Sequence, residues 1–229
     1  MVLYKHNELL TFFDRFTHTL SNRDSGTPVY TDYYLIKDSI SMLLHLDVFE
    51  DKLRLYHTKN DKPLLDMSNT KVSIIKKENN SLIFLNNSDT STEALKMEFI
   101  FEESVSVRIY NQERVKQVDK PIQYDTYDML ELFWMEEDTI KKTESHHIVQ
   151  YTRTINEVTI NFRFDILQNT VEIEIFDQQH VYLTSFINNI SKLTTEDNML
   201  TIYRQERAIA KIFLNDKVYI LFENEFYYD

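Results

Sequence analysis

Glycine is almost missing from this chain: Gly26 is the only one in 229 residues. Average usage would give roughly 16 glycines. Phosphate-binding loops need several, because their backbone approaches the ligand closely or takes a positive φ. The lack of G-x-G-x-x-G, Walker A and G-x-S-x-G patterns argues against Rossmann oxidoreductases, P-loop NTPases and α/β-hydrolases. We expect asparagine and aspartate to form the turns instead.

Cysteine is absent, which excludes disulfides, thiol catalysis and thiolate metal sites. Long apolar runs are also missing, the longest being stretches such as VYILF at 218–222. The first residues, MVLYKHNELLTFF, contain Lys5, His6, Asn7 and Glu8, and they have no apolar core segment or small-residue cleavage site typical of a secretory signal. These features predict an intracellular, cytoplasmic protein without a transmembrane segment.

Positive charge is scarce, with 25 Lys and Arg against 37 Asp and Glu and a net charge of −12. Such a chain repels the nucleic-acid backbone, so we expect no direct nucleic-acid binding. The acidity is typical of a solubilising surface. It also suits a protein that meets a basic partner or that mimics nucleic acid.

The hydrophobic pattern predicts an α+β fold, predominantly antiparallel β-sheet with about three to four helices. Apolar residues at helical spacing indicate helices near Lys5–Leu20, from Asp38 or Ser39 to about Val48, over 126–142, and near Thr184–Lys192. Alternating segments indicate strands at 29–36, 52–56, 71–77, 81–85, 95–101, 105–110, 147–153, 157–166, 170–176, 199–204, 208–214 and 217–222. The stretch 115–123 is a candidate linker, which predicts two similar α+β halves, 1–118 and 119–229, or else a single domain.

One phrase recurs: IYNQERV at 109–115, IFDQQHV at 175–181 and IYRQERA at 202–208. Alternation places Val105, Val107 and Ile109 on a core face, with Tyr110 on the opposite face. The phrase is therefore interpreted as a strand, an aromatic residue and a polar turn. Internal duplication is one alternative, and a set of Gln and Arg side chains that bind a common partner is another.

No catalytic constellation stands out. Seven histidines are scattered, at positions 6, 18, 45, 57, 146, 147 and 180. His146 and His147 would point to opposite faces of a strand, and His45-x-Asp47 is too short a pattern to predict a metal site. Asp38, Glu50 and Lys52 weakly match the carboxylate, carboxylate-x-Lys arrangement of metal-dependent nucleases. We therefore predict no catalytic residue, cofactor or metal.

The function predicted is that of a non-enzymatic, acidic protein-binding module, such as an intracellular inhibitor, immunity protein or adaptor. Its partner would be a basic or nucleic-acid-handling protein. The alternatives are a metal-dependent hydrolase or nuclease with unfamiliar spacing and an oligomeric structural or assembly component. The residues predicted for the interface are acids and outer-face aromatics: Asp128, Glu131, Glu136, Glu137, Glu172, Glu174, Tyr110, Phe176 and Tyr203.

Overall fold

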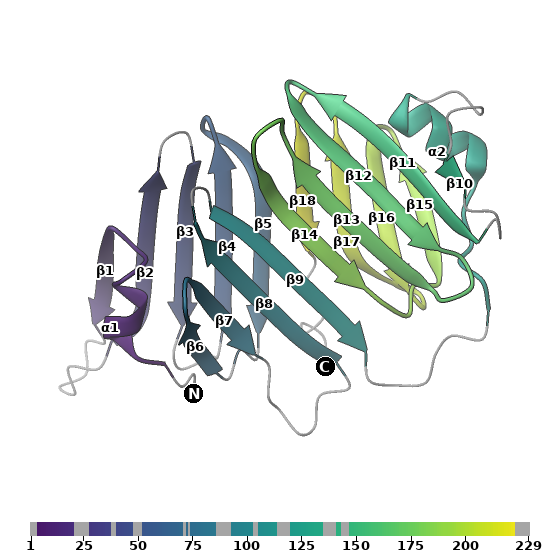
Figure 1. Ribbon diagram of the computed structural model, residues 1–229. Coiled ribbons are helices and arrows are strands. Elements are labelled where there is room, and N and C mark those ends of the chain that lie inside the picture. The colour runs from purple at the N-terminus through teal and green to yellow at the C-terminus, as the bar shows by residue number, and fades with distance from the viewer. Residues whose placement is uncertain are drawn as a thin grey trace.

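The computed structural model is built almost entirely from β-strands, with two short helices in its described part (Figure 1). It describes residues 4–20, 28–37, 40–47, 52–70, 72, 74–85, 93–102, 105–113, 120–134, 141–142 and 147–222. The helices are α1 (His6–Leu9) and α2 (Thr126–Phe133). No helix among these residues is long and apolar enough to cross a membrane.

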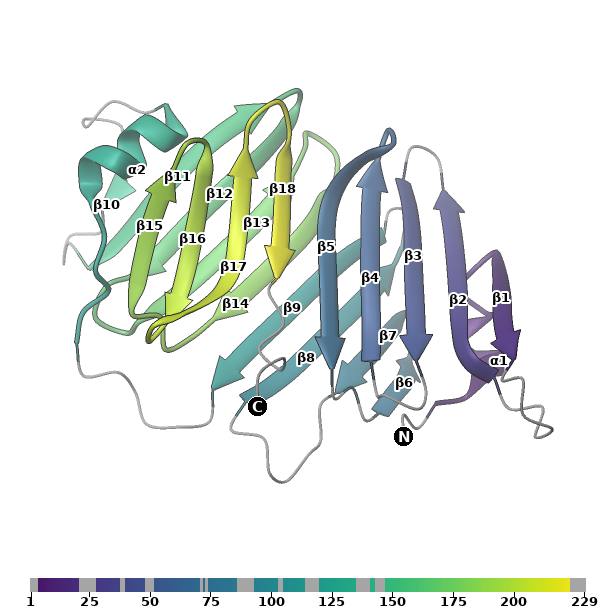
Figure 2. The same cartoon turned by 180° about the vertical axis from the view of Figure 1, so that it is seen from behind.

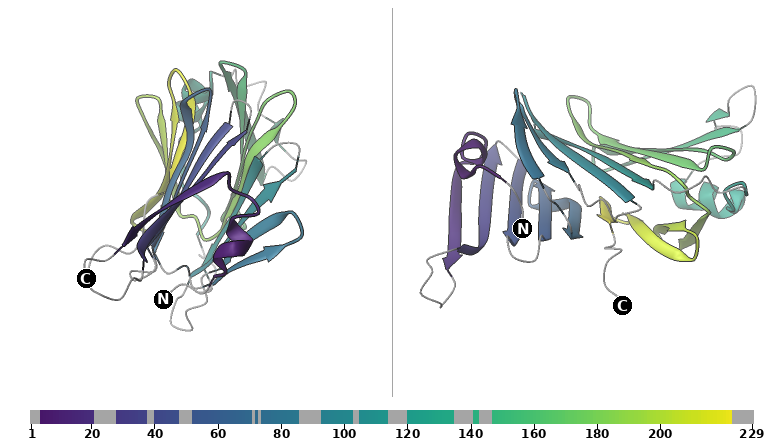
Figure 3. Two further views of the ribbon diagram at one scale, coloured as in Figure 1. Left: turned by 90° about the vertical axis from the view of Figure 1, so that its left-hand side faces the viewer. Right: turned by 90° about the horizontal axis from the view of Figure 1, so that it is seen from below.

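The strands form two nine-stranded sheets that lie face to face, as the views in Figure 3 show. Sheet B, seen from its own side in Figure 2, has the order β1 (Arg15–Leu20), β2 (Pro28–Lys37), β3 (Ile40–Asp47), β4 (Lys52–Lys59), β5 (Lys62–Thr70), β18 (Val218–Phe222), β17 (Arg207–Leu214), β16 (Met199–Arg204), β15 (Lys192–Glu196). Sheet A has the order β10 (Lys141–Lys142), β11 (Ile148–Ile155), β12 (Val158–Asp165), β13 (Thr170–Phe176), β14 (Val181–Ile187), β9 (Val105–Glu113), β8 (Glu93–Phe101), β7 (Ser81–Leu85), β6 (Ile74–Glu78).

The core lies between the two sheets. Successive side chains of a strand point to opposite faces, so alternate residues enter the core. The burial of β12 and β13 follows this alternation residue by residue, and Val105, Val107 and Ile109 of β9 are buried as the sequence predicted. The turns confirm a second prediction, since seven of the ten described non-glycine residues with positive φ are Asn or Asp.

The predicted α+β class is wrong, because the described residues are mostly strand and each of the four predicted helical segments contains strand residues. The segment near Lys5–Leu20 contains one helical turn, α1, and then β1, which pairs with β2. The segment that we predicted to run as a helix to Val48 is β3, in which Ile40, Met42, Leu44 and Leu46 are buried at a period of two. The helix predicted near Thr184–Lys192 is the end of β14, and α2 ends at Phe133.

Strand order relates the two halves of the chain. The first half consists of α1, then β1–β5 in sheet B, then β6–β9 in sheet A. The second half repeats this order with the sheets exchanged: α2, then β10–β14 in sheet A, then β15–β18 in sheet B. In each half, the fifth strand pairs in parallel with the last strand of the other half. These parallel pairs are β5–β18 and β14–β9. Each sheet therefore contains strands of both halves, related by an approximate two-fold arrangement.

The register supports the same relation in detail. Adding 118 to the bounds of β3 gives those of β12, and the same addition carries β6 onto β15. It also aligns Glu78-Asn79-Asn80 with Glu196-Asp197-Asn198, two turns in which Asn79 and Asp197 both have positive φ. In the parallel pairs, Leu65 lies opposite Ile220 and Leu183 lies opposite Val107. Leu65 and Leu183 are 118 positions apart, but their partners Val107 and Ile220 are 113 apart, so the last strands of the two halves are related by a shift of 113. The residues at these two shifts are called repeat equivalents below.

The recurring phrase of the sequence does not follow this relation. Its copies end β13 and β16, where the polar residues form turns as predicted. The copy at 109–115 is different, because β9 continues through Glu113. The copies therefore lie at places in the two sheets that are not repeat equivalents, and similar strand composition accounts for their likeness.

Candidate functional site

Helix α2 lies at one edge of the molecule, next to β11 and β15 (Figure 1). Asp125 caps its first turn, accepting hydrogen bonds from the backbone N–H groups of Tyr127 (2.8 Å) and Asp128 (3.2 Å). One side of the helix is apolar and buried, and the Phe133 ring lies 5.4 Å from the ring of Tyr151. The other side faces solvent, with Tyr127 75% exposed.

The segment before α2 is fixed to the edge of sheet B. Gln123 donates its backbone N–H to Ser191 (3.0 Å) and accepts from Leu193 (2.8 Å), so that it forms a parallel bridge with Lys192 at the start of β15. This bridge holds α2 beside β15 and the turn that follows it. Residues far apart in the sequence are thereby brought to one edge.

Two adjoining hollows, each of about 400 Å³, lie between α2 and β15. Asp128 and Thr195 line both of them. The charged residues of the two linings are five acids and one base: Asp125, Asp128, Glu131, Glu196, Asp197 and Lys192. We call this part of the surface the acidic edge. Carboxylates predominate in it, so its local field favours a cationic ligand.

Trp134 stands at the rim of the acidic edge and is 74% exposed. It ends α2 in the left-handed conformation, with φ 54°, which glycine usually occupies at a helix end. The Arg153 guanidinium lies 3.6 Å from the centre of the indole ring, within cation–π distance. Arg153 is buried, which lowers the pKa of its guanidinium, and it donates a hydrogen bond to the carbonyl oxygen of Leu132. The exposed indole is therefore held from below.

The predicted interface residues lie in three places. Asp128 and Glu131 line the acidic edge. Tyr203 is on the outer face of sheet B, where the Lys192 ammonium lies 5.9 Å from its ring centre. Glu136 and Glu137 lie outside the described residues.

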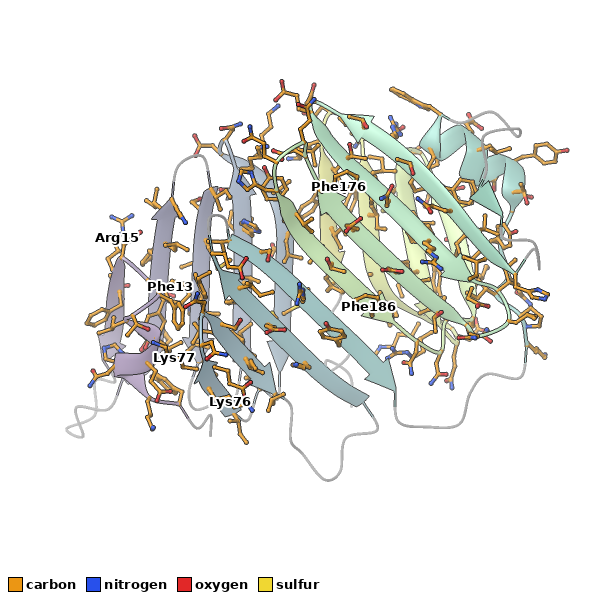
Figure 4. All side chains as sticks on the ribbon, in the orientation of Figure 1. Phe13, Arg15, Lys76, Lys77, Phe176 and Phe186 are labelled. Atoms are coloured by element: carbon orange, nitrogen blue, oxygen red, sulfur yellow. The ribbon has the colours of Figure 1, made fainter. Side chains whose placement is uncertain are left out.

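The remaining four predicted residues, Tyr110, Glu172, Glu174 and Phe176, are on the outer face of sheet A, where Figure 4 labels Phe176 and Phe186. Tyr110 stacks on Phe186 with ring centres 5.4 Å apart, and Phe186 lies opposite Glu172 in the sheet. Tyr110 is half-buried in this stack, so its ring is only partly exposed on the outer face.

Sequence reasoning missed Trp134, Arg153, Glu196 and Asp197 as parts of the acidic edge. Trp134 falls inside the helix predicted over 126–142, and the acids of the turn after β15 carry no local signal. The bridge between Gln123 and Lys192 helps to hold Glu196 and Asp197, at the end of β15, near α2.

The histidine and carboxylate patterns do not converge. Within the described part of the chain, no group of three His, Cys, Asp or Glu side chains is placed to hold a metal ion. His45 bonds Asp32 of the neighbouring strand (Nδ1 to Oδ1, 2.5 Å). His146, Asp38 and Glu50 lie outside the described residues.

A second charged cluster joins the two halves. Lys59 and Asp177, which are repeat equivalents, form an ion pair with each other, and the Tyr182 hydroxyl also donates to Asp177. Burial favours a higher pKa for Asp177, but the hydrogen bonds from Lys59, Tyr182 and two backbone N–H groups outweigh it and hold the pKa below its usual range. All its charges are paired within the protein, so this cluster is structural.

No known family model matches the chain, and no curated protein matches it.

Proposed function

We propose that the protein is a non-enzymatic binding module whose acidic edge binds a basic segment of another protein, as an inhibitor, immunity protein or adaptor would. The proposal rests on one observation: an exposed tryptophan, held in place by a buried arginine, stands beside hollows lined by five carboxylates. Action inside the cell, on a nucleic-acid-handling partner, belongs to the same proposal.

The position of Trp134 favours a binding role over a structural one. An exposed side chain adds little to the core, and a non-glycine residue in the left-handed region costs about 1–2 kcal/mol. A strained, exposed and supported indole is therefore what a preorganised binding anchor requires. Arg153 lies against the ring, so little side-chain entropy is lost when a ligand contacts it.

The negative charge of the acidic edge favours a partner segment rich in lysine and arginine. Asp128 and Glu131 lie one helical turn apart on α2, and Glu196 and Asp197 face them from the turn after β15. Lysine or arginine side chains of a partner can pair with these carboxylates from either side of the hollow. Such pairing accelerates association and weakens as salt is added.

Calorimetric titration with an octapeptide of alternating lysine and arginine tests the proposal, and a Glu/Asp octapeptide serves as the ligand control. We expect the basic peptide alone to bind, with affinity that falls as salt rises. The double charge reversal Asp128→Lys with Glu131→Lys should weaken binding at least tenfold, because like charges then face the peptide.

The matched control is the reversal of Glu172 and Glu174 to lysine, which changes net charge equally on the outer face of sheet A. Equal losses from the two double variants would mean that only net charge attracts the peptide, and they would refute a local site. Unchanged binding in the α2 variant would refute the proposal outright.

A further inference from the structure

A hollow of about 750 Å³ lies on the outer face of sheet B and shares no lining residue with the acidic edge. Figure 2 shows the strands of this sheet from the same side. Its lining comes from β2, β3, β4, β5 and β18: Asp32, Leu43, His45, Arg54, Tyr56, Pro63, Asp66 and Tyr219. Strand pairing aligns Asp32, His45 and Arg54 in one row across the sheet, and Leu43, Tyr56 and Asp66 in the next. We call this surface the tyrosine hollow.

The charged side chains of the tyrosine hollow form hydrogen bonds within it. Arg54 donates two hydrogen bonds to Asp66, from Nε to Oδ1 (3.1 Å) and from a terminal nitrogen to Oδ2 (2.8 Å). An ionised carboxylate only accepts, so His45 Nδ1 donates to Asp32 and a neutral ring keeps its lone pair on Nε2. A charged ligand would have to compete with these pairs. A neutral ligand with hydroxyl groups can bond the remaining donors and acceptors without breaking them.

Two rings of the hollow, those of Tyr219 and His45, pack against neighbouring rings. Phe213 stacks on Tyr219 with ring centres 5.5 Å apart, and Tyr30 lies 5.3 Å from the His45 ring. Burial and the nearby Asp66 raise the pKa of Tyr219, so its hydroxyl keeps its proton and can donate. Fixed ring faces beside paired donors and acceptors suit a ligand with apolar C–H faces and polar edges.

The approximate two-fold arrangement provides an internal comparison. In the same order as the lining above, the repeat equivalents on sheet A are Gln150, Asn161, Arg163, Glu172, Glu174, Val181, Thr184 and Ser106. None of these is aromatic, although the equivalent strands cover the core in the same way. The fold therefore does not require the tyrosines or the His45–Asp32 pair at these positions.

From this combination we infer that the tyrosine hollow binds a neutral oligosaccharide. Each hexose unit offers a C–H face for Tyr56 or Tyr219 and hydroxyls that both donate and accept. A proline-rich peptide also packs on tyrosine rings, but its prolines lack N–H donors. Such a peptide would leave His45 Nε2 and the free carboxylate lone pairs without partners, so the oligosaccharide fits better.

Calorimetric titration of the full chain with cellohexaose, xylohexaose, mannohexaose and maltohexaose tests this inference. We expect at least one to bind with a dissociation constant of about 1 mM or below. Tyr56→Ala should weaken that binding about tenfold through loss of the ring, and Tyr56→Phe should weaken it less. The matched control is Glu174→Ala, the repeat equivalent on sheet A, which should bind as the unmodified chain does.

Three results would overturn the inference. They are no binding of any of the four sugars, equal loss in Tyr56→Ala and Glu174→Ala, or tighter binding of a deca-proline peptide than of every sugar at this hollow. Circular dichroism spectra of each variant separate loss of binding from loss of fold. The octapeptide titration is independent of these outcomes, because the acidic edge shares no residue with the tyrosine hollow.

Discussion

Replacing His57 by isoleucine should stabilise the protein. His57 of β4 is fully buried, and neither ring nitrogen has a hydrogen-bond partner within the described part of the chain. Leaving such a group unbonded costs about 1–3 kcal/mol. The repeat equivalent of His57 is Ile175, which is also fully buried. Isoleucine therefore fits this place in a strand, and we expect His57→Ile to raise the free energy of unfolding by about 1–3 kcal/mol at pH 7.5.

The pH dependence makes this prediction sharper. Burial lowers the pKa of His57 to about 4, whereas an unfolded histidine titrates near 6.5. Between these values the unfolded chain binds a proton that the folded chain does not, so acidification favours unfolding. The difference of about 2.5 units corresponds to about 3 kcal/mol of stability lost by the unmodified chain as pH falls from about 6.5 to 4. His57→Ile removes this loss.

Urea unfolding followed by circular dichroism at pH 4.5, 5.5, 6.5 and 7.5 measures both effects. The gap in stability between His57→Ile and the unmodified chain should widen by about 1.4 kcal/mol for each unit below pH 6.5. Every other titrating group is common to both chains, so it cancels in the difference. A gap that stays constant from pH 7.5 to 4.5 would refute the assignment of His57 as a buried, neutral and unbonded ring.

Three further substitutions test the Lys59–Asp177 ion pair, which joins the two halves, and the acidic edge. Asp177→Asn should destabilise the protein by about 3 kcal/mol by leaving Lys59 unpaired. Because the pKa of Asp177 is lowered, the stability that the ionised carboxylate contributes should be lost only as pH falls below about 3.9. Equal urea midpoints of the two chains at pH 7 would contradict the pairing. Trp134→Gly should abolish octapeptide binding. It should change the free energy of unfolding by no more than about 1 kcal/mol, since relief of the left-handed strain offsets the lost Arg153 contact. Binding retained in calorimetry would exclude the indole as the anchor. Arg153→Met should weaken octapeptide binding about tenfold through a less ordered indole, and an unchanged affinity would argue against the support from below.

The strands that alternate strictly were predictable, because burial on one face leaves a period-two pattern. Strands β11, β12, β13 and β18 follow that pattern, whereas β14 and β15 were not predicted. The helices failed where apolar residues fall on both faces of a strand. In β3, Leu43 of the outer face stands three residues after buried Ile40 and next to buried Leu44, and this i, i+3, i+4 pattern imitates a helix. Pairing with neighbouring strands determines whether such a segment forms a strand or a helix, and the local sequence does not reveal those neighbours.

The site was predictable only in part, for the same reason. Asp128 and Glu131 could be chosen from the helix pattern alone. Glu196 joins them because β15 lies beside α2, an arrangement that depends on the topology of both halves. Similarly, the only acidic neighbour that the sequence analysis considered for His45 was Asp47, whereas His45 bonds Asp32 of the adjacent strand β2.

The most direct test of the proposed function uses the fluorescence of Trp134, which is the only tryptophan of the chain. The Lys/Arg octapeptide is added at low salt while the emission wavelength and quenching by acrylamide are followed. Binding at the acidic edge predicts that the emission moves to shorter wavelength, that acrylamide quenches it less, and that salt reverses both changes. Octapeptide binding in calorimetry without any change in Trp134 emission would place the site elsewhere and contradict the account.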